Sequence, residues 1–451
     1  MASSSNRPPS SLEARILRWW LAVCVVVGLT LCVSQLLEIP ARSALRGYDN
    51  TFNYLWLRSA MVDGDWDFRN DLQECDTLPP EYRASALGLP VTANGRIPNK
   101  YGIGWAVLTL PFFAVADGLV WAGRELNLWT YQNDGFNPVY QVCIQIGHAG
   151  LALLALWMAI RTVTDWIGNR EAALAGVVTT WAASPLIYYQ TANVSMSHGA
   201  AFFAISSLAY ALFRVRHAPD RKRWWLVAGA SLGLAIVVRY QLAIFALPAA
   251  WSLWQLRPEF RRLTWAAGCF AMAVLPFLML QSWAWRVVYG EWFVFSYGAE
   301  GESFHWNNPE LVNSFFSPRH GLFYWHPFLL IGAVGMLAWA WRVRGAAIPW
   351  ISCVALIAYV NAAWWCWWFA SSFGNRGYDA ALLPFMAGGG FLMLSVKGRA
   401  RSLLWGAAII LGLWNFYAVW LYRAGAISRS EPVTWWEMVK AVSRLSEATK
   451  F

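Results

Sequence analysis

Charged residues are scarce in this sequence. Asp, Glu, Lys and Arg together make up 13% of the 451 residues, whereas a soluble domain usually carries about a quarter. Hydrophobic residues make up 58%, and apolar runs of about 20 residues recur, each long enough to cross roughly 30 Å of hydrocarbon. The composition excludes an ordinary soluble protein and predicts an all-α polytopic membrane protein.

Several familiar sequence signals are also missing. A glycine-rich phosphate loop is absent, which argues against a soluble nucleotide as donor or energy source. No period of 20 to 50 residues indicates a repeat array. Of the cysteines only Cys75 lies in a long polar loop, so we expect no disulfide framework. The apolar run near the N-terminus lacks a small-residue cleavage site, which favours a retained span over a signal peptide.

The net charge of +10 has a simpler explanation than a nucleic-acid partner. Basic residues cluster in short loops between apolar runs, where the positive-inside rule expects them. These loops predict an inside N-terminus and inside segments at 161–170, 214–223, 257–262, 342–344 and 397–401. Alternation places regions 38–100, 190–197, 286–322 and 369–379 outside. We therefore expect a transmembrane domain over 1–422, with about 11–13 spans, and a short outside tail over 423–451.

One segment does not fit this alternation. With both the N-terminus and 161–170 inside, residues 101–123 cannot form a single ordinary crossing. Pro111 and Gly118 interrupt the segment, which favours a broken or re-entrant pair lining a cavity. A wrong assignment at one end of the segment explains the conflict equally well.

The first outside region begins with a helical pattern. Its polar stripe at i, i+3, i+4 and i+7 consists of Arg46, Asp49, Asn50 and Asn53, and a flatter apolar face consists of Phe52, Leu55, Trp56 and Ser59. This pattern predicts a helix lying on the membrane surface. Asp49, near its start, suits a general base for an acceptor hydroxyl or amine. The same position also suits an acid that caps the helix.

A second acidic run, DGDWDFRNDLQE, follows this helix. Asp63, Asp65, Asp67, Asp71 and Glu74 occupy positions 1, 3, 5, 9 and 12 of a calcium-loop count. Phe68 stands at the sixth position, where the sharp turn requires Gly. A solvated acidic turn therefore fits better than a metal site, with Asp63, Asp65 and Asp67 as the alternative ligands.

Cationic and hydrogen-bonding residues recur at the outside ends of predicted spans: Lys100, His198, Arg239, Arg319, His320 and Arg376. A charge at a membrane boundary is unfavourable unless it is solvated, paired or used, and any one of these residues also suits an interfacial anchor. Taken together they predict a site for a phosphate or diphosphate headgroup, which Arg grips bidentately. The run WWCWW at 364–368 fits an aromatic belt, or aromatic walls for a sugar or a polyprenyl chain.

Several stretches resemble the GT-C superfamily of membrane glycosyltransferases, in particular bacterial proteins similar to protein O-mannosyltransferases and lipid A aminoarabinose transferases. They are GYDNTFNYLWLRSAMVDGDWDF, NKYGIGWAVLTLPFF, SMSHGAAFF, SPRHGLFYWHPF and WWCWWFASSFGNRGYD, spread over residues 45–380. The resemblance implies a helical bundle whose first periplasmic loop carries interfacial helices and a catalytic acid. It also implies transfer of a sugar from a polyprenyl-phosphate carrier to a lipid, glycan or protein acceptor.

On this resemblance Asp49 is the general base of an inverting reaction in a bacterial inner membrane, with the site facing the periplasm. Arg376, Arg239, Lys100 and His198 are expected to bind the donor phosphate. The residues expected to contact substrate are Asn53, Arg58, Tyr101, Arg319, His320 and Trp365. The protein mannosyltransferases carry Asp-Glu where this chain has Asp49-Asn50, and the lipid A enzymes carry a large C-terminal domain that is not seen here. No cofactor is assigned, and a divalent metal stays an open option.

Two other classes fit the composition. A transporter or lipid flippase for a glycolipid or anionic solute usually shows internal repeats and ionisable groups near the middle of its spans. Here most predicted spans have clean centres and polar density lies on one side. Asp117 and His148 are the exceptions. A scaffold without catalysis is a third reading, but it does not explain the ordered outside motifs.

Overall fold

The computed structural model describes residues 11–39, 45, 47–75, 78–299 and 301–448, and in these ranges the chain is largely helical. The first half forms α1 (Ser11–Glu38), α2 (Tyr48–Arg58), η1 (Ser59–Asp63), α3 (Phe68–Glu74), α4 (Pro80–Leu87), α5 (Gly104–Glu125), α6 (Pro138–Ile167), α7 (Arg170–Ala182), α8 (Leu186–Thr191) and α9 (Ser197–His217). The second half forms α10 (Lys222–Val238), η2 (Tyr240–Phe245), α11 (Ala246–Trp254), α12 (Phe260–Tyr289), α13 (Ser296–Ala299), α14 (Leu311–Phe316), α15 (Leu322–Trp325), α16 (Phe328–Val343), η3 (Arg344–Ala346), α17 (Ile348–Ala363), η4 (Arg376–Ala381), α18 (Leu382–Ser395), α19 (Gly398–Arg423) and α20 (Trp435–Ala448).

Long apolar helices dominate the described part of the chain. Seven are long and apolar enough to cross a membrane: Leu12–Glu38, Gly104–Glu125, Pro138–Ile167, Ser197–His217, Phe260–Tyr289, Arg376–Ser395 and Gly398–Arg423. The apolar helices α16 and α17 are shorter. Other apolar runs of the sequence fold as still shorter pieces, for example the run near 241–256, which divides into η2 and α11. The predicted all-α polytopic membrane fold is confirmed.

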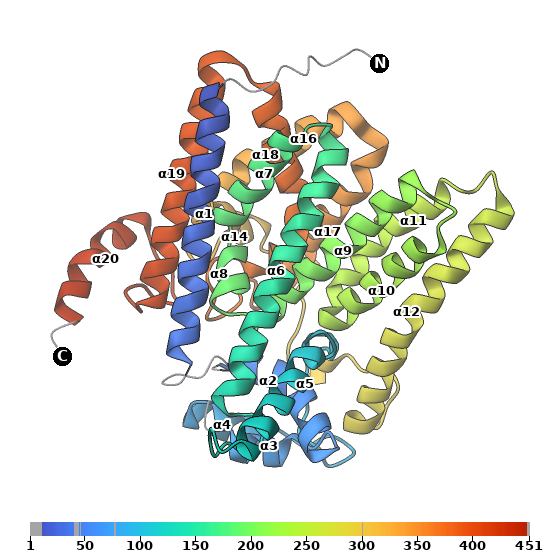
Figure 1. The fold of residues 1–451 in the computed structure, drawn as a ribbon, viewed down its shortest axis with the longest axis vertical. Coiled ribbons are helices and arrows are strands. Elements are labelled where there is room, and N and C mark those ends of the chain that lie inside the picture. Colours follow the sequence, from blue (N-terminus) through green and yellow to red (C-terminus); the bar gives the residue numbers. More distant parts are fainter. Residues whose placement is uncertain (1–10, 40–44, 46, 76–77, 300, 449–451) are drawn as a thin grey trace.

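The arrangement separates two ends of the bundle (Figure 1). In that view α1, α6 and α19 run between the upper and lower ends, and α2, α3, α4 and α5 gather at the lower end. Helix α6 ends, and α19 begins, near the upper end, where α1 also begins. The first polar region of the sequence therefore forms a helical layer at one end of the bundle.

Helix α5 resolves the conflict in the predicted alternation. It is one unbroken helix that continues through Pro111. Thr109 contacts His148 of α6, whereas Asp117, further along α5, accepts a hydrogen bond from Tyr140 near the start of α6. Helix α5 therefore runs antiparallel to the first part of α6 and returns to the end of the bundle where α6 begins. The loop that connects α5 to α6 therefore begins and ends at the same end of the bundle.

Helix α2 exists as predicted, but it does not lie on a surface. Every residue from Asn50 to Arg58 is buried, on the predicted apolar face and on the polar stripe alike. Tyr54 packs against Trp105 and Phe113 of α5, so the helix is covered by its neighbours. Arg46, which was expected to belong to the polar stripe, lies outside the described residues.

Small residues bring α18 close to its neighbours. A Cβ atom added to Gly388 would lie 2.1 Å from the carbonyl oxygen of Gly332 in α16, and one added to Gly176 in α7 would lie 2.4 Å from the backbone nitrogen of Gly390. Glycine permits this close backbone packing, which drives helix association in membranes. Because η4 leads directly into α18, the same packing fixes the position of Arg376.

Candidate active site

A large cavity lies where the predicted phosphate-binding residues meet. Its volume is about 1310 Å³, which is above the roughly 300–1,000 Å³ of common small-molecule pockets. Most of the lining is apolar or aromatic, including Trp285, Phe293, Phe295, Phe304, Trp306, Trp364, Trp365 and Phe369. The charged and polar lining residues include Asp49, Lys100, Tyr101, His198, Arg239, Glu302 and Arg376. The cavity thus combines a long apolar wall with a compact set of charges.

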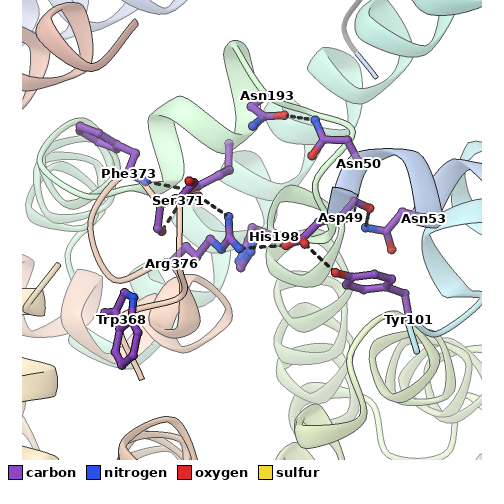
Figure 2. Close-up of polar contacts among 12 residues, drawn as sticks. Asp49, Asn50, Asn53, Tyr101, Asn193, His198, Trp368, Ser371, Phe373 and Arg376 are labelled. Carbon is purple, nitrogen blue, oxygen red and sulfur yellow. Dashed lines mark hydrogen bonds and ion pairs between the residues drawn. The ribbon is translucent and has the colours of Figure 1, made fainter. Parts of the chain in front are cut away.

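Asp49 lies at the centre of the polar contacts (Figure 2). Its Oδ2 is 2.8 Å from Arg376 Nη2, and its Oδ1 accepts a hydrogen bond from Tyr101 Oη at 2.5 Å. The Asp49 side chain is 31% exposed and lines the cavity. Residues far apart in the sequence are therefore brought onto one carboxylate that remains open to the cavity.

Asparagines hold the backbone beneath Asp49. Asn53 Nδ2 donates to the Asp49 carbonyl oxygen at 2.8 Å, and Asn50 Nδ2 donates to Asn193 Oδ1 at 2.7 Å. No side chain caps the start of α2, and the Asp49 carboxylate points to Tyr101 and Arg376 instead. The capping role considered for Asp49 is not what the geometry shows, and Asn53 supports Asp49 rather than lining the cavity.

The environment keeps Asp49 ionised. Burial alone would raise the pKa of its carboxyl, but the charge of Arg376, the hydrogen bond from Tyr101 and the charges of Lys100 and Arg239 together lower that pKa below its usual value. Because an ionised carboxylate has spare lone pairs, Asp49 can accept a further proton-donating group while it keeps both contacts. This is the protonation state that a general base requires at neutral pH.

Close backbone contact places Tyr101. A Cβ atom added to Gly102 would lie 2.1 Å from the carbonyl oxygen of Val237, and one added to Gly104 would lie 2.4 Å from the backbone nitrogen of Val238. The glycines of the sequence YGIG therefore let the start of α5 touch the end of α10. This contact sets Tyr101 opposite Arg239, which follows α10 directly.

Arg239 and His198 form a second polar group in the cavity lining. Arg239 Nη1 donates to His198 Nδ1 at 2.8 Å. Asp379 Oδ2 lies 3.8 Å from the same His198 nitrogen. Asp379 is 1% exposed, and neither of its carboxylate oxygens has a hydrogen-bond partner. The buried Asp379 side chain therefore lies next to the polar group formed by Arg239 and His198.

Lys100 is held by a carboxylate and by aromatic rings. Its Nζ lies 2.5 Å from Glu302 Oε1, and Glu302 Oε2 accepts from Trp364 Nε1 at 2.9 Å. Rings of Tyr48, Tyr101 and Tyr297 lie 5.4, 5.5 and 6.0 Å from the ammonium group, within cation–π range. In this state the phosphate-binding candidate Lys100 is already paired.

The segment after α17 carries strained backbone beside the arginines. Phe369 and Ala370 have φ values of 63° and 50°, which are uncommon for residues other than glycine and concentrate at functional sites. The guanidinium carbons of Arg239 and Arg376 each lie 5.9 Å from the Phe369 ring. Trp365, in the same segment, lines the cavity as predicted for a substrate contact.

The structure does not bring Arg58 to the cavity. Its side chain is 2% exposed, and it forms ion pairs with Asp63, with Asp71 at 3.0 Å and with Glu74 at 2.6 Å. Burial raises the pKa of Asp71 to about 7, against the opposing effect of Arg58. Arg58 therefore stabilises the first polar layer, and the predicted substrate contact is corrected.

The degenerate calcium loop is organised without metal geometry. Asp65 accepts hydrogen bonds from Ser59 Oγ at 3.0 Å and from the Asp67 backbone nitrogen at 2.8 Å, and Asp67 caps α3. Asp63 faces Arg58. Within the described ranges no three His, Cys, Asp or Glu side chains are arranged to hold a metal ion. The hydrogen bonds of Asp65 and Asp67 are those of an acidic turn.

Arg319 and His320 also lie away from the cavity lining. Arg319 Nε donates to the Ser430 carbonyl oxygen at 2.8 Å, and its guanidinium lies 4.1 Å from the Trp368 ring. His320 is fully buried and its Nδ1 lies 2.7 Å from the Trp368 carbonyl oxygen. Burial lowers the His320 pKa to about 4, so the ring is neutral at pH 7. Both residues fix the 364–376 segment rather than contacting the cavity.

Some lining residues were not singled out from the sequence. Glu302 and Tyr297 come from the region predicted outside at 286–322, but no pattern marks them there. Asp379 is the last residue of the quoted stretch GNRGYD, three positions after Arg376, and its i, i+3 spacing on η4 was the available signal. Asp379 and the predicted phosphate ligand Arg376 therefore belong to the same turn, η4.

No protein-family model and no curated protein matches the sequence. Comparison with solved structures gives the fold. ArnT from Cupriavidus metallidurans, bound to undecaprenyl phosphate, has a TM-score of 0.51 and 16% identity, over 90% of this chain and 69% of that chain. Its apo state has the same TM-score with 14% identity over the same shares. At this identity the likeness shows that the chain shares its fold with ArnT.

A second protein with this fold comes from an archaeon. The oligosaccharyltransferase AglB from Archaeoglobus fulgidus, in complex with an inhibitory peptide and a dolichol-phosphate, has a TM-score of 0.52 and 12% identity. The match covers 92% of this chain but only 56% of AglB. The chain thus spans little more than half the length of that protein.

Proposed function

We propose that the protein is a membrane glycosyltransferase that moves a sugar from a polyprenyl-phosphate carrier to an acceptor. The observation that carries this proposal is the ionised Asp49 carboxylate, open to a cavity that also presents Arg376, Arg239 and Lys100. The solved structures of similar fold support it, since ArnT is bound to undecaprenyl phosphate and AglB is in complex with a dolichol-phosphate.

In this proposal each charge has a distinct role. Asp49 takes the proton of the acceptor hydroxyl or amine as that nucleophile forms a bond to the anomeric carbon. The bond from this carbon to the phosphate oxygen breaks on the opposite face, so the configuration inverts. Polyprenyl phosphate leaves with the electron pair, and Arg376, Arg239 and Lys100 stabilise its charge. His198 accepts a hydrogen bond from Arg239 and thereby positions the Arg239 guanidinium.

The apolar walls suit the lipid part of such a donor. A sugar phosphate alone would leave most of the 1310 Å³ cavity empty, whereas the aromatic walls can bind the first isoprene units beside it. Trp365, Trp364 and Phe369 line the same space and can stack on either a sugar face or a polyprenyl chain. The identity of the sugar and of the acceptor is left open in this proposal.

Charge balance gives the donor a specific requirement. Lys100 is paired with Glu302 and Arg376 with Asp49, so two of the three cations already have a carboxylate. A phosphate that binds either of them competes with that carboxylate. Glu302 lies on a loop between short helices, whereas Asp49 belongs to α2. The donor phosphate is therefore proposed to take the place of Glu302 on Lys100.

The same account proposes an orientation. The basic segment 161–170 lies at the end of α6, and the basic segment 342–344 lies at the end of α16. The basic segment 397–401 lies at the start of α19. Two of these ends, the end of α6 and the start of α19, lie at the upper end of Figure 1, opposite the layer that contains α2. Under the positive-inside rule, that layer and Asp49 face outside, which in a bacterial inner membrane is the periplasm.

An activity assay tests the proposal. Purified protein in phospholipid vesicles is incubated with a panel of polyprenyl-phosphate sugars, with nucleotide sugars as the control donors. The expected result is release of polyprenyl phosphate from at least one lipid-linked sugar and none from the nucleotide sugars. Movement of the intact lipid-linked sugar between leaflets without bond cleavage would support the transporter or flippase alternative instead.

A further inference from the structure

The region after the last long span folds into a helix. Residues 423–451 were expected to form a short outside tail, but Trp435–Ala448 forms α20. Its side chains are described as far as Ser443. Helix α20 takes no part in the cavity lining, so its role is separate from the proposed reaction.

Three faces can be distinguished on α20. Met438 and Ala441 are fully buried and face the protein. The exposed apolar face consists of Trp435, Trp436, Val439 and Val442, which are 47%, 64%, 53% and 49% exposed. Glu437 and Lys440 are also exposed and lie on the remaining side of a 3.6-residue helix. The sequence thus gives one face to protein, one to an apolar medium and one to water.

Contacts with α19 and α15 fix the position of α20 against the bundle. Tyr417 Oη of α19 donates to the Met438 carbonyl oxygen at 2.7 Å. Trp435 stacks on Tyr324 of α15 with ring centroids 4.9 Å apart, and Trp435 Nε1 donates to the Tyr324 carbonyl oxygen at 2.9 Å. These contacts hold α20 beside the bundle. The side chains of Trp436, Val439 and Val442 remain exposed.

The contacts also set the level of α20 along the bundle. Arg423, at the end of α19, pairs with Glu38 at 2.7 Å and with Ser34 at 2.6 Å at the end of α1, which marks the polar boundary of both helices. Tyr417 precedes Arg423 by six positions, which is about 9 Å along a helix. In Figure 1, α20 lies beside the lower half of α1 and α19 and not beyond their ends.

We propose that α20 is an interfacial helix whose exposed apolar face is seated in the lipid bilayer. The apolar face continues an exposed apolar surface of α19 that includes Leu413 and Trp420, which are 48% and 49% exposed on a helix apolar enough to cross a membrane. Trp at a membrane boundary and a basic residue on the polar side are typical of such helices. Lys440 Nζ lies 4.8 Å from the Trp436 ring, at the edge between the two faces, where it meets anionic headgroups.

A depth measurement tests this placement. A nitroxide is attached to Val439→Cys on the apolar face, with Lys440→Cys on the polar side as the matched control. Both positions are exposed, so neither substitution disturbs the packed face. The background carries Cys32→Ala and Cys143→Ala, which removes the two cysteines that are not fully buried. The full chain is reconstituted in phosphatidylethanolamine–phosphatidylglycerol vesicles.

The relaxation agents distinguish three surroundings. A lipid-seated face predicts that oxygen relaxes the nitroxide at 439 more than a water-soluble nickel chelate does, with the opposite order at 440. Stronger relaxation by nickel at 439 would place the face in water and overturn the proposal. Little relaxation by either agent at 439 would mean that protein, such as a second copy of the chain, covers the face, and this result would overturn the proposal as well.

Discussion

The acid-rich stretch after α1 supplies carboxylates to two arginines, Arg58 and Arg376. The two clusters differ in sequence separation and in exposure. Arg58 binds Asp63, Asp71 and Glu74, all within 16 positions of it, and it is 2% exposed. Arg376 instead reaches Asp49 across 327 positions, and Asp49 is 31% exposed toward the cavity. The local, closed cluster of Arg58 stabilises the first polar layer. The distant, open pair of Arg376 and Asp49 leaves the Asp49 carboxylate accessible from the cavity.

The largest effect is expected at the open cluster. Asp49→Asn keeps the shape of the side chain but cannot accept the proton, so turnover should fall by about 10²- to 10⁴-fold, the range typical of a general base. Donor binding and the thermal unfolding midpoint should stay close to those of the wild type. Steady-state kinetics with a lipid-linked sugar measures the loss, and Asp67→Asn, which keeps the cap of α3, serves as the control with normal turnover.

The closed cluster should respond in stability instead. Arg58→Ala leaves the buried Asp71 carboxylate without its cation, and breaking such a pair typically costs about 3–5 kcal/mol. We expect a large drop in the thermal unfolding midpoint of the purified protein. Arg376→Ala is the matched arginine: its unfolding midpoint should change less, while turnover should fall by about 10²- to 10³-fold. Equal destabilisation by the two substitutions would remove the distinction between the clusters.

A third pair, Lys100–Glu302, sharpens the comparison because substitution should improve binding. Glu302→Gln removes the carboxylate that competes with the donor phosphate for Lys100. An ion pair worth about 1 kcal/mol corresponds to roughly fivefold tighter binding of undecaprenyl phosphate, measured by calorimetry. Lys100→Gln should weaken the same binding. If Glu302→Gln binds more weakly than the wild type, Glu302 orients Lys100 and does not compete with the ligand.

The smallest effect concerns pH. The hydrogen bond from Tyr101 helps to lower the Asp49 pKa, so Tyr101→Phe should raise it. Because Asp49 works as a base only when deprotonated, activity would then be lost at a higher pH as the solution is acidified. The acidic limb of kcat/KM should move upward in the variant, with little change in rate at neutral pH. An unmoved limb would mean that another group controls it.

Parts of this arrangement were accessible from the sequence and parts were not. The i, i+3, i+4 pattern predicted α2, and its polar stripe singled out Asp49, because helical periodicity is a local property. Burial of α2 was missed, since the neighbouring layer that covers it comes from α5 and from the segment after it. A pattern of three or four residues cannot show which other elements will pack on it.

Pairing between charges was the least predictable feature. Arg58 and Arg376 each stand a few positions before an acid, Asp63 and Asp379. Only the fold shows that Arg58 meets its acids through a local turn and that Arg376 meets Asp49 through a contact across the bundle. Glu302 carried no signal because its partner Lys100 lies 202 positions away. Asp379 was visible in GNRGYD, but its burial depends on the packing of α18.

The most direct test of the central claim is a structure of the protein with undecaprenyl phosphate. The account predicts that the phosphate lies in the cavity within hydrogen-bond distance of Arg376, Arg239 or Lys100, that Glu302 has left Lys100, and that the isoprenoid chain runs along the aromatic wall. A phosphate bound outside the cavity, with Asp49 and Arg376 still paired and no lipid contact to either, would contradict it.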